Sequence, residues 1–234
     1  MTIGCDVAGT EQTWNAQQLA QPVLKPTWRL WAYRKPSVVL GCSQRALLSE
    51  ARKSDGIELL IRSSGGGAVL TVPWMLGLSV ALPLNHSLLQ LSPGASYRWL
   101  GELLAATLRR AGIAALAMPC DSSGLRRSAG ELSWACFGGV SAWEVVVRDR
   151  KIAGLAQVRR RQGILLVGGL LLALPDWDLL CASLGKPAHN AAMLRRHTTS
   201  CIEESGTPDA IPWIVETLTR KLDSAAGRVS IPLK

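Results

Sequence analysis

No stretch of the 234-residue sequence is apolar over enough length to cross a bilayer. The most apolar run, at residues 163–175, is shorter than the ~20 residues of a membrane-spanning helix, and Gly168, Gly169 and Pro175 interrupt it. An export signal is also missing, because the IGC segment at residues 3–5 lacks the apolar region of about 7 to 15 residues that should precede a cleavage site. We therefore expect a cytoplasmic protein without a membrane partner.

The cysteines and histidines lack the paired spacing that metal sites require. The six cysteines include no CxxC pair, and His86, His189 and His197 are scattered without ligand spacing. Dense disulfide frameworks belong to small secreted chains with closely patterned cysteines, which this sequence does not resemble. We therefore expect reduced thiols and no metal site.

Acidic residues are outnumbered, with 17 Asp and Glu against 26 Lys and Arg, which gives a net charge of +9. Such a surplus favours an anionic partner through long-range attraction. The sequence contains neither a zinc-finger spacing nor an aromatic RNA-binding signature, and its longest basic block is RRRQ at residues 159–162. We expect no nucleic-acid partner, which leaves a phosphorylated cofactor or an acidic carrier protein.

Strand patterns and helix patterns come in clusters along the chain. Residues 28–40 predict two strands that form a hairpin with a turn at Lys35-Pro36, and residues 134–171 predict consecutive strands with tight turns. Residues 92–113 predict a long helix from their apolar spacing, and the segments 175–185 and 212–225 predict short helices. The fold class we expect is α+β, with a mixed, largely antiparallel sheet flanked by helices.

Three consecutive glycines follow a predicted strand in the segment Arg62-Ser63-Ser64-Gly65-Gly66-Gly67-Ala68-Val69. Glycines lose more conformational entropy on folding than other residues, so a run of them indicates positive φ or a close approach of the main chain to another group. The segment lacks the GK[ST] of a phosphate-binding P-loop and does not follow the GxGxxG pattern. A tight turn and a ligand-binding loop both remain open.

Cys136 and Lys151 lie at opposite ends of a second suggestive segment. Cys136 precedes two glycines, and Lys151 follows a predicted turn and precedes the small residues Ala153 and Gly154. A free cysteine is most often a small core residue, and a lysine at a turn is most often solvated. If paired strands bring the two together, however, the ammonium would favour the nucleophilic thiolate.

The order of SSGGGAV, a cysteine and RKIAGLAQ over residues 28–175 resembles the lipoate–protein ligase and octanoyltransferase superfamily, which includes relatives of biotin–protein ligase. The resemblance implies one biotin/lipoate ligase-like catalytic domain over residues 1–234, with a short helical tail at about 176–234. It implies that Arg62 and the residues Ser64, Gly65, Gly66, Gly67, Ala68 and Val69 line the groove for an octanoyl or lipoyl chain.

The same resemblance assigns further site residues. Gly41 and Gln44 match a family glycine and glutamine near the pocket, and Lys151, followed by Ala153 and Gly154, matches the lysine that contacts the acyl carbonyl or the acyl-adenylate phosphate. Cys136 lies fifteen positions before this lysine, as the catalytic cysteine does in the cysteine-dependent octanoyltransferases.

The implied reaction is octanoyl or lipoyl transfer through a Cys136 thioester to a lysine of a lipoyl carrier domain. That carrier would be the glycine cleavage H protein or a 2-oxoacid dehydrogenase E2, with acyl carrier protein as donor and no cofactor. One alternative is an ATP-dependent lipoate ligase that uses ATP and Mg. Another is a catalytically silent lipoyl-domain-binding protein, because Thr71 and Val72 replace a family His-Asp pair and Val167 replaces a family histidine.

Overall fold

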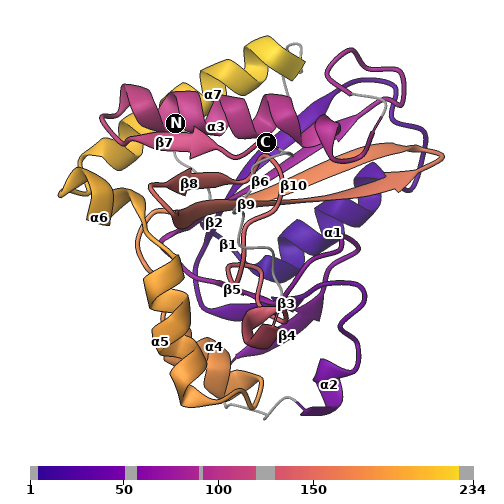
Figure 1. Cartoon of the computed structure of the whole chain (residues 1–234). Coiled ribbons are helices and arrows are strands. Elements are labelled where there is room, and N and C mark those ends of the chain that lie inside the picture. The colour runs from indigo at the N-terminus through magenta and orange to yellow at the C-terminus, as the bar shows by residue number, and fades with distance from the viewer. Residues whose placement is uncertain (1–4, 51–56, 90–91, 120–129, 227–234) are drawn as a thin grey trace.

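The computed structural model describes residues 5–50, 57–89, 92–119 and 130–226 (Figure 1). The strands are β1 Cys5–Asp6, β2 Thr27–Tyr33, β3 Ser37–Leu40, β4 Glu58–Ile61, β5 Val69–Thr71, β6 Met75–Leu82, β7 Ala115–Ala117, β8 Val145–Val147, β9 Arg150–Arg160 and β10 Gly163–Leu171. The helices are α1 Ala8–Gln18, α2 Leu47–Glu50, α3 Arg98–Arg110, α4 Trp177–Ser183, α5 Ala188–His197, α6 Cys201–Ser205 and α7 Ala210–Ala226, with 3-10 turns η1 Ala95–Tyr97 and η2 Gly130–Leu132.

The larger sheet has the strand order β1-β2-β6-β10-β9-β8-β7 within the described residues. Only β1 and β2 pair in parallel there, and the other neighbours are antiparallel. Every residue of β6 is buried, which explains its continuous apolar sequence, because a central strand covered on both faces needs no polar alternation. The expected α+β class with a mixed, largely antiparallel sheet is confirmed.

The smaller sheet has the order β4-β3-β5, and its strands β3 and β4 run parallel. The predicted hairpin at residues 28–40 is therefore wrong, because β2 pairs with β1 and β6 while β3 pairs with β4 and β5. The turn at Lys35-Pro36 carries the chain from one sheet to the other. All four residues of β3 are buried, so this strand is stabilised between two partners rather than by β2.

Among the described residues, the two larger hydrophobic cores lie on opposite sides of the larger sheet, and a third, smaller cluster contains Leu19, Val158 and Leu165. One core packs the sheet against α3 and α7, which cover its upper face in Figure 1. The other joins the smaller sheet to the opposite face and includes residues of α1, α4 and α5. The predicted helix within residues 92–113 is confirmed as η1 followed by α3, which ends at Arg110 before Gly112 in the left-handed conformation at φ +82°.

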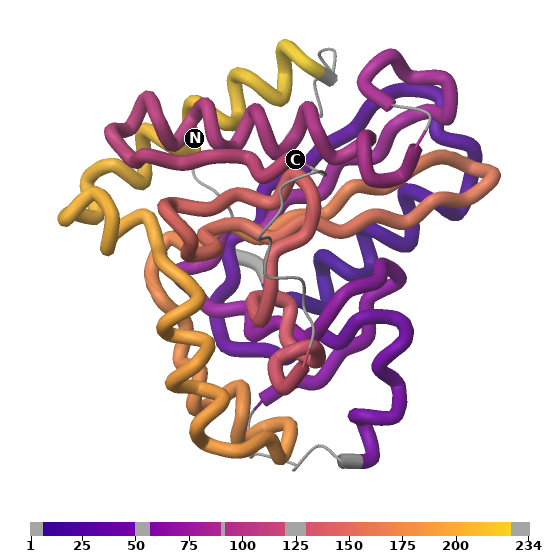
Figure 2. The backbone as a smooth tube through the Cα atoms, viewed as in Figure 1, coloured from indigo at the N-terminus to yellow at the C-terminus, as the bar shows by residue number. Residues whose placement is uncertain are grey.

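The segment after β10 forms α4, α5, α6 and α7, which run from α4 at the bottom up the left side through α5 and α6 to α7 at the top (Figures 1 and 2). The predicted helices at 175–185 and 212–225 correspond to α4 and α7, whereas α5 and α6 were not foreseen. Asp176 caps α4 by accepting a hydrogen bond from the Leu179 N–H, and Ser200 caps α6 by accepting one from the Glu203 N–H. Both cores include residues of these helices, so the segment packs onto the sheets.

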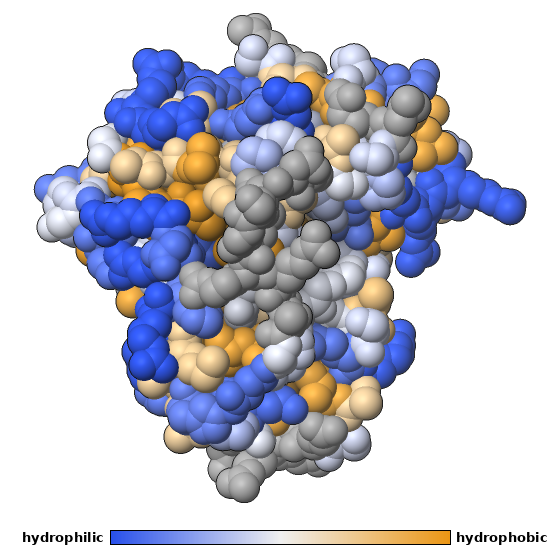
Figure 3. Space-filling view, in the orientation of Figure 1, coloured by the Kyte–Doolittle hydropathy of each residue, from blue (hydrophilic) through white to orange (hydrophobic). Residues whose placement is uncertain are grey.

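Polar residues separate the apolar areas on the face drawn in Figure 3. Among the described residues, no helix combines the length and the apolar character needed to pass through a bilayer. The chain therefore hides its large apolar side chains chiefly in the two cores, where the sheets meet the helices.

Candidate active site

Cys136 lies in a segment of turns that runs beside the smaller sheet (Figure 2). The sequence pattern of residues 134–139 predicted a strand here, which is wrong, because only Ala135 forms a bridge, to Ala68. The Cys136 N–H donates to the Ala68 carbonyl at 2.8 Å, and the Ala68 N–H donates to the Trp134 carbonyl at 2.7 Å. These two bonds fix the backbone on both sides of Ala135, directly before Cys136, against the end of the glycine loop.

Gly67 is the glycine that permits this contact. A Cβ atom added to Gly67 would lie 2.5 Å from the Ala135 carbonyl carbon and 2.6 Å from the Cys136 nitrogen. Backbone atoms at these distances cannot yield to a side chain without moving the whole segment. The glycine run therefore serves, at this position, the close approach of the main chain that carries Cys136.

Arg62 holds the glycine loop in shape from inside. Its guanidinium donates to the carbonyls of Gly65, Gly67 and Val39 at 2.7 to 3.3 Å, and the residue is 8% exposed. A planar guanidinium suits this arrangement because its donors are fixed in a fork that reaches several acceptors at once. Gly66 lies at φ +93°, where a residue with a Cβ would be strained.

Gly41 and Gln44 join the same assembly from the loop after β3. A Cβ on Gly41 would lie 1.9 Å from the Gly66 carbonyl oxygen, so only glycine allows the two loops to touch. The Gln44 side chain accepts from the Gly41 N–H at 3.1 Å and donates to the Trp134 carbonyl at 2.8 Å. The structure therefore brings both residues to the Cys136 segment, as supports of its backbone.

The Trp134 side chain is held from the helical segment after β10. Its indole N–H donates to the Asn190 side chain at 3.1 Å, and Asn190 donates to Glu131 at 2.9 Å. His189 also contacts Glu131, and this hydrogen bond lowers the pKa of the Glu131 carboxyl. Contacts from two distant parts of the chain thus converge on the residues just before Cys136.

A β-bulge at the start of β9 orients Lys151. One step along β8, from Val145 to Val146, corresponds to two steps along β9, from Ala153 to Lys151, so Ile152 is the extra residue. A bulge interrupts the alternation of side chains between the two faces of a sheet. Ile152 and Ala153 are accordingly both buried in the core beneath α3, and Lys151 points to the other side.

The Lys151 ammonium is buried among oxygen atoms beside Cys136. Its Nζ lies 2.6 Å from a Glu144 carboxylate oxygen, and it donates to the carbonyls of Cys136 at 2.6 Å and Gly139 at 3.0 Å. The Lys151 side chain is 2% exposed and the Glu144 side chain 4%. The Phe137 ring lies 5.2 Å from the same nitrogen. An isolated charge would be very costly here, and the carboxylate offsets that cost.

The thiol of Cys136 and the amine of Lys151 both lie close to Gly154. A Cβ atom at this position would lie 3.3 Å from the Cys136 Sγ and 3.4 Å from the Lys151 Nζ. Both atoms therefore lie beside the bare main chain of β9 at this glycine. The predicted convergence of the two side chains is present in the structure.

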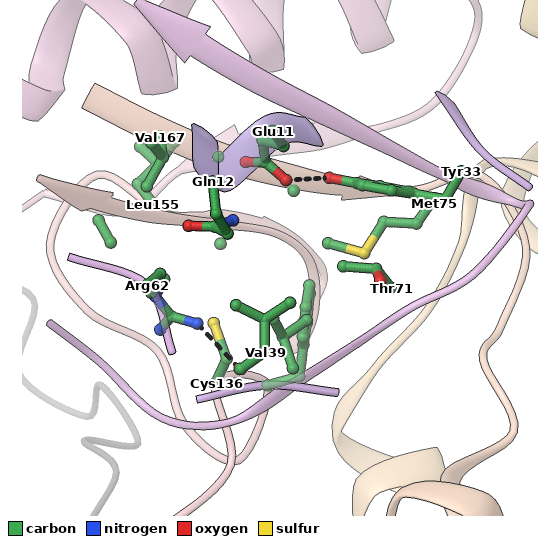
Figure 4. A pocket seen from close by; sticks show the side chains of 16 residues that line it. Glu11, Gln12, Tyr33, Val39, Arg62, Thr71, Met75, Cys136, Leu155 and Val167 are labelled. Carbon is green, nitrogen blue, oxygen red and sulfur yellow. Dashed lines mark hydrogen bonds between the residues drawn. The ribbon is translucent and has the colours of Figure 1, made fainter. Parts of the chain in front are cut away.

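A pocket that is partly open to solvent lies at Cys136 and extends between the two sheets (Figure 4). Four sequence-predicted residues line it, namely Arg62, Val69, Cys136 and Gly154. Its lining residues are Glu11, Gln12, Tyr33, Val39, Arg62, Val69, Thr71, Met75, Cys136, Phe137, Gly154, Leu155, Ala156, Val167, Gly168 and Gly169. Most of this wall is apolar or glycine, which suits a hydrocarbon chain better than a polar ligand.

The remaining predicted residues lie around the pocket without lining it. Gly41, Gln44 and the loop residues 64–68 support the backbone behind Cys136, and the Ser64 hydroxyl is buried without a hydrogen-bond partner among the described residues. Lys151 lies behind Cys136 and Gly154, and Ala153 faces the core beneath α3. Some of the predicted residues therefore line the pocket, and others support the backbone around Cys136.

Sequence reasoning missed the residues that α1 and β2 contribute to the pocket. The Tyr33 hydroxyl donates to Glu11 at 2.8 Å on the side of the pocket away from Cys136 (Figure 4). The Asn15 side chain donates to the other Glu11 oxygen at 3.4 Å. Glu144 was missed as well. The signal available was the spacing of Glu11 and Asn15 one helical turn apart, but both residues read as exposed because they are polar.

Two of the family positions that differ in this chain face the pocket. Thr71 and Val167 both line it, and the Thr71 hydroxyl donates to the Ser37 carbonyl at 3.1 Å. This bond occupies the hydroxyl proton of Thr71, between β5 and β3. Across the described ranges, no group of three or more His, Cys, Asp or Glu side chains is arranged to hold a metal ion.

Solved structures of similar fold are lipoate ligases. A putative lipoate protein ligase from T. acidophilum with bound lipoic acid superposes with a TM-score of 0.70 at 19% identity, over 96% of this chain and 83% of that one. A lipoate-protein ligase A bound with ATP gives a TM-score of 0.69 at 21% identity, over 95% and 83%. At these identities the likeness shows the fold, and it confirms the expected ligase-like architecture.

Sequence comparison gives nearer relatives. The chain is 34% identical over 210 residues to the octanoyltransferase LipM of Kyrpidia tusciae, which covers 86% of this chain and 76% of that protein. It is 33% identical over 168 residues to the octanoyltransferase LipM of an Exiguobacterium species, over 69% of this chain and 59% of the relative. The model of the lipoyl protein ligase A/B catalytic domain matches residues 10–222. The chain therefore belongs to the lipoyl protein ligase A/B catalytic domain family.

Proposed function

We propose that the protein is an octanoyltransferase that carries the acyl group on Cys136 and delivers it to a lysine of a lipoyl domain. The observation that carries this proposal is the position of the Cys136 thiol at a largely apolar pocket, with the Lys151 ammonium behind Gly154. The relatives named octanoyltransferase LipM support the same reaction.

The transfer has two steps that conserve atoms and charge. The Cys136 thiolate attacks the carbonyl carbon of an octanoyl thioester, the new carbon–sulfur bond forms, and the carrier thiolate leaves and takes up a proton. The neutral amine of the acceptor lysine then attacks the Cys136 thioester, an amide bond forms, and the Cys136 thiol is regenerated. Each step exchanges one acyl bond, so the reaction requires neither an oxidant nor a nucleotide.

The acyl chain would lie along the apolar wall of the pocket. We assign Val39, Val69, Met75 and Leu155 to contact with its methylene groups, because each lines the pocket and offers hydrocarbon surface. Arg62 and the residues Gly41, Gln44, Ser64, Gly65, Gly66, Gly67 and Ala68 would act by fixing the main chain that surrounds Cys136.

The basic charge fits the proposed macromolecular partners. A net charge of +9 favours an acidic protein through long-range attraction. As a member of its family the protein acts on lipoyl domains, and we propose the glycine cleavage H protein or a 2-oxoacid dehydrogenase E2 as acceptor and acyl carrier protein as donor. We place the reaction in the cytoplasm, where a catalytic thiol stays reduced, and we assign it no cofactor.

The test is acyl transfer onto the protein itself. Incubation with octanoyl-acyl carrier protein should increase the intact mass by one octanoyl group, and the added mass should be absent from Cys136→Ala. The exposed thiol of Cys42 supplies the matched control, because Cys42→Ala should keep the adduct. Absence of any adduct on the unaltered protein would overturn the proposal.

A second assay separates the transferase from an ATP-dependent ligase. The unaltered protein should modify a lipoyl domain from octanoyl-acyl carrier protein without ATP and Mg, and it should fail to release pyrophosphate with lipoate. A ligase would instead release pyrophosphate with lipoate and ATP, and Cys136→Ser would retain that activity. A catalytically silent protein would bind the lipoyl domain and modify it under neither condition.

A further inference from the structure

The Lys151 ammonium has three hydrogen-bond donors, and the structure provides three acceptors for them. Two are the main-chain carbonyls of Cys136 and Gly139, and the third is a carboxylate oxygen of Glu144. The two carbonyls flank the residues that follow the thiol directly. The ammonium therefore closes the chain from Cys136 to Gly139 into a defined shape, while the carboxylate compensates its charge.

Glu144 is itself fixed by two backbone donors. The Ser141 N–H donates to its Oε2 at 2.7 Å, and the Leu155 N–H donates to its Oε1 at 3.1 Å. Ser141 belongs to the loop that carries Cys136, and Leu155 belongs to β9 and lines the pocket. A carboxylate with both oxygens bonded holds one position, so the amine that it pairs with is held as well.

Buried ion pairs are weak contributors to net stability, because desolvation of two charges opposes their attraction. The pair also satisfies the backbone N–H groups of Ser141 and Leu155, so its contribution lies in fixing these segments more than in the attraction of the two charges. The carboxylate is, in addition, absent from the wall of the pocket, so it touches no acyl chain there. An effect on the reaction would therefore pass through Lys151.

We propose that Glu144 is a positioning residue that holds the Lys151 amine and, through it, the backbone of Cys136 in the reactive arrangement. The proposal rests on the proposed function only in taking Cys136 as the nucleophile. Glu144 does not touch the substrate in this proposal, whereas Cys136 forms the thioester bond to the acyl group.

The experiment compares Glu144→Gln, Glu144→Asp, Lys151→Met and the double variant Glu144→Gln/Lys151→Met. One readout is the rate of Cys136 alkylation by iodoacetamide, followed by mass spectrometry of the Cys136 peptide. The other is the rate of Cys136 acylation by an octanoyl thioester, and thermal unfolding reports whether each variant folds. Glu216→Gln, which removes an exposed carboxylate on α7, is the matched control.

We expect Glu144→Gln to slow both reactions of Cys136 at least tenfold and Glu144→Asp to recover most of that loss, because aspartate keeps the counter-charge of the amine. The double variant should be no slower than Lys151→Met alone, because the proposal attributes the effect of Glu144 on the thiol to its contact with Lys151. Glu216→Gln should leave both rates unchanged.

Two results would overturn the proposal. One is a folded Glu144→Gln variant with unchanged rates, and the other is a double variant in which the two single losses multiply. If Glu144→Gln fails to fold, the Glu144→Asp and double variants still decide, because the first keeps the charge and the second removes both charges. Alkylation that changes as expected, with no octanoyl adduct on the unaltered protein, would refute the transferase and leave the positioning role intact.

Discussion

The methyl group of an alanine at position 154 would lie close to both the thiol and the amine. It would lie 3.2 Å from the Lys151 Cε, 3.3 Å from the Cys136 Sγ and 3.4 Å from the Lys151 Nζ. Ordinary contacts of a methyl carbon are longer than the first two of these distances, so Lys151 Cε and Cys136 Sγ have to move by a few tenths of an ångström. The Lys151 ammonium donates a hydrogen bond to the Cys136 carbonyl. A shift of the Lys151 side chain therefore also displaces the backbone that carries the Cys136 thiol.

The size of the effect follows from that displacement. A misplacement of about 1 Å in an active site costs about a hundredfold in rate, so a few tenths of an ångström should slow Cys136 acylation by roughly three- to tenfold. Excess volume in a packed interior costs about 1–3 kcal/mol, and loss of glycine flexibility in the unfolded chain returns about 0.4–1 kcal/mol. The free energy of unfolding should therefore fall by roughly 0.5–2 kcal/mol in Gly154→Ala.

The assay is the rate of octanoyl adduct formation by Gly154→Ala, measured beside urea denaturation of the same sample. Gly9→Ala in α1 is the matched control, because its new Cβ would meet only the Glu58 side chain, at an ordinary 3.4 Å. We expect this control to acylate at the unaltered rate and to gain about 0.5–1 kcal/mol from helix propensity. A Gly154→Ala variant that acylates as fast as the control would refute the argument that the thiol and amine need bare backbone beside them.

Two further predictions concern stability. Burial raises the pKa of the Cys201 thiol from 9.0 to about 12, so above pH 9 the unfolded chain loses a proton that the folded chain keeps, and unfolding becomes easier by up to about 1.4 kcal/mol per pH unit. As the pH rises from 8.5 to 10.5, the urea midpoint of unfolding should decrease, and it should decrease less in Cys201→Ala. An equal decrease in the two proteins would count against the role of the Cys201 thiol. Arg62→Lys keeps the charge but loses the fork that reaches Gly65 and Gly67, so urea denaturation should show a loss of about 1–3 kcal/mol; an unchanged midpoint would contradict the role of the fork.

Strands and helices with a strong apolar pattern were predictable from the sequence. The helix α3 follows from apolar spacing of one helical face, and β6 and β10 follow from compact apolar runs. The predicted hairpin at residues 28–40 was wrong because the turn residues Lys35-Pro36 show only that the chain changes direction. They do not show whether the next strand pairs with the previous one or joins the other sheet. Helix α1 was missed because Glu11 and Asn15, which it buries, look like surface residues.

The candidate site was predictable only in part, and the reason is geometric. The motif spacing indicated that Cys136 and Lys151 belong together, but the alternation of β9 alone would place Lys151 and Ala153 on one face. The extra residue Ile152 separates them, and a bulge between apolar neighbours leaves no mark in the sequence. The pairing of Lys151 with Glu144 depends on that bulge, so it became visible only in three dimensions.

Two of the replaced family positions, Thr71 and Val167, lie in the wall of the pocket. Thr71 bonds to the Ser37 carbonyl and Val167 is apolar, so the wall they form offers hydrocarbon where the resemblance implied histidine. Neither residue is among the recorded partners of the Lys151 ammonium or the Glu144 carboxylate. The contacts of Lys151 and Glu144 beside Cys136 form without them, which supports the proposed transferase with an altered pocket over a protein that only binds.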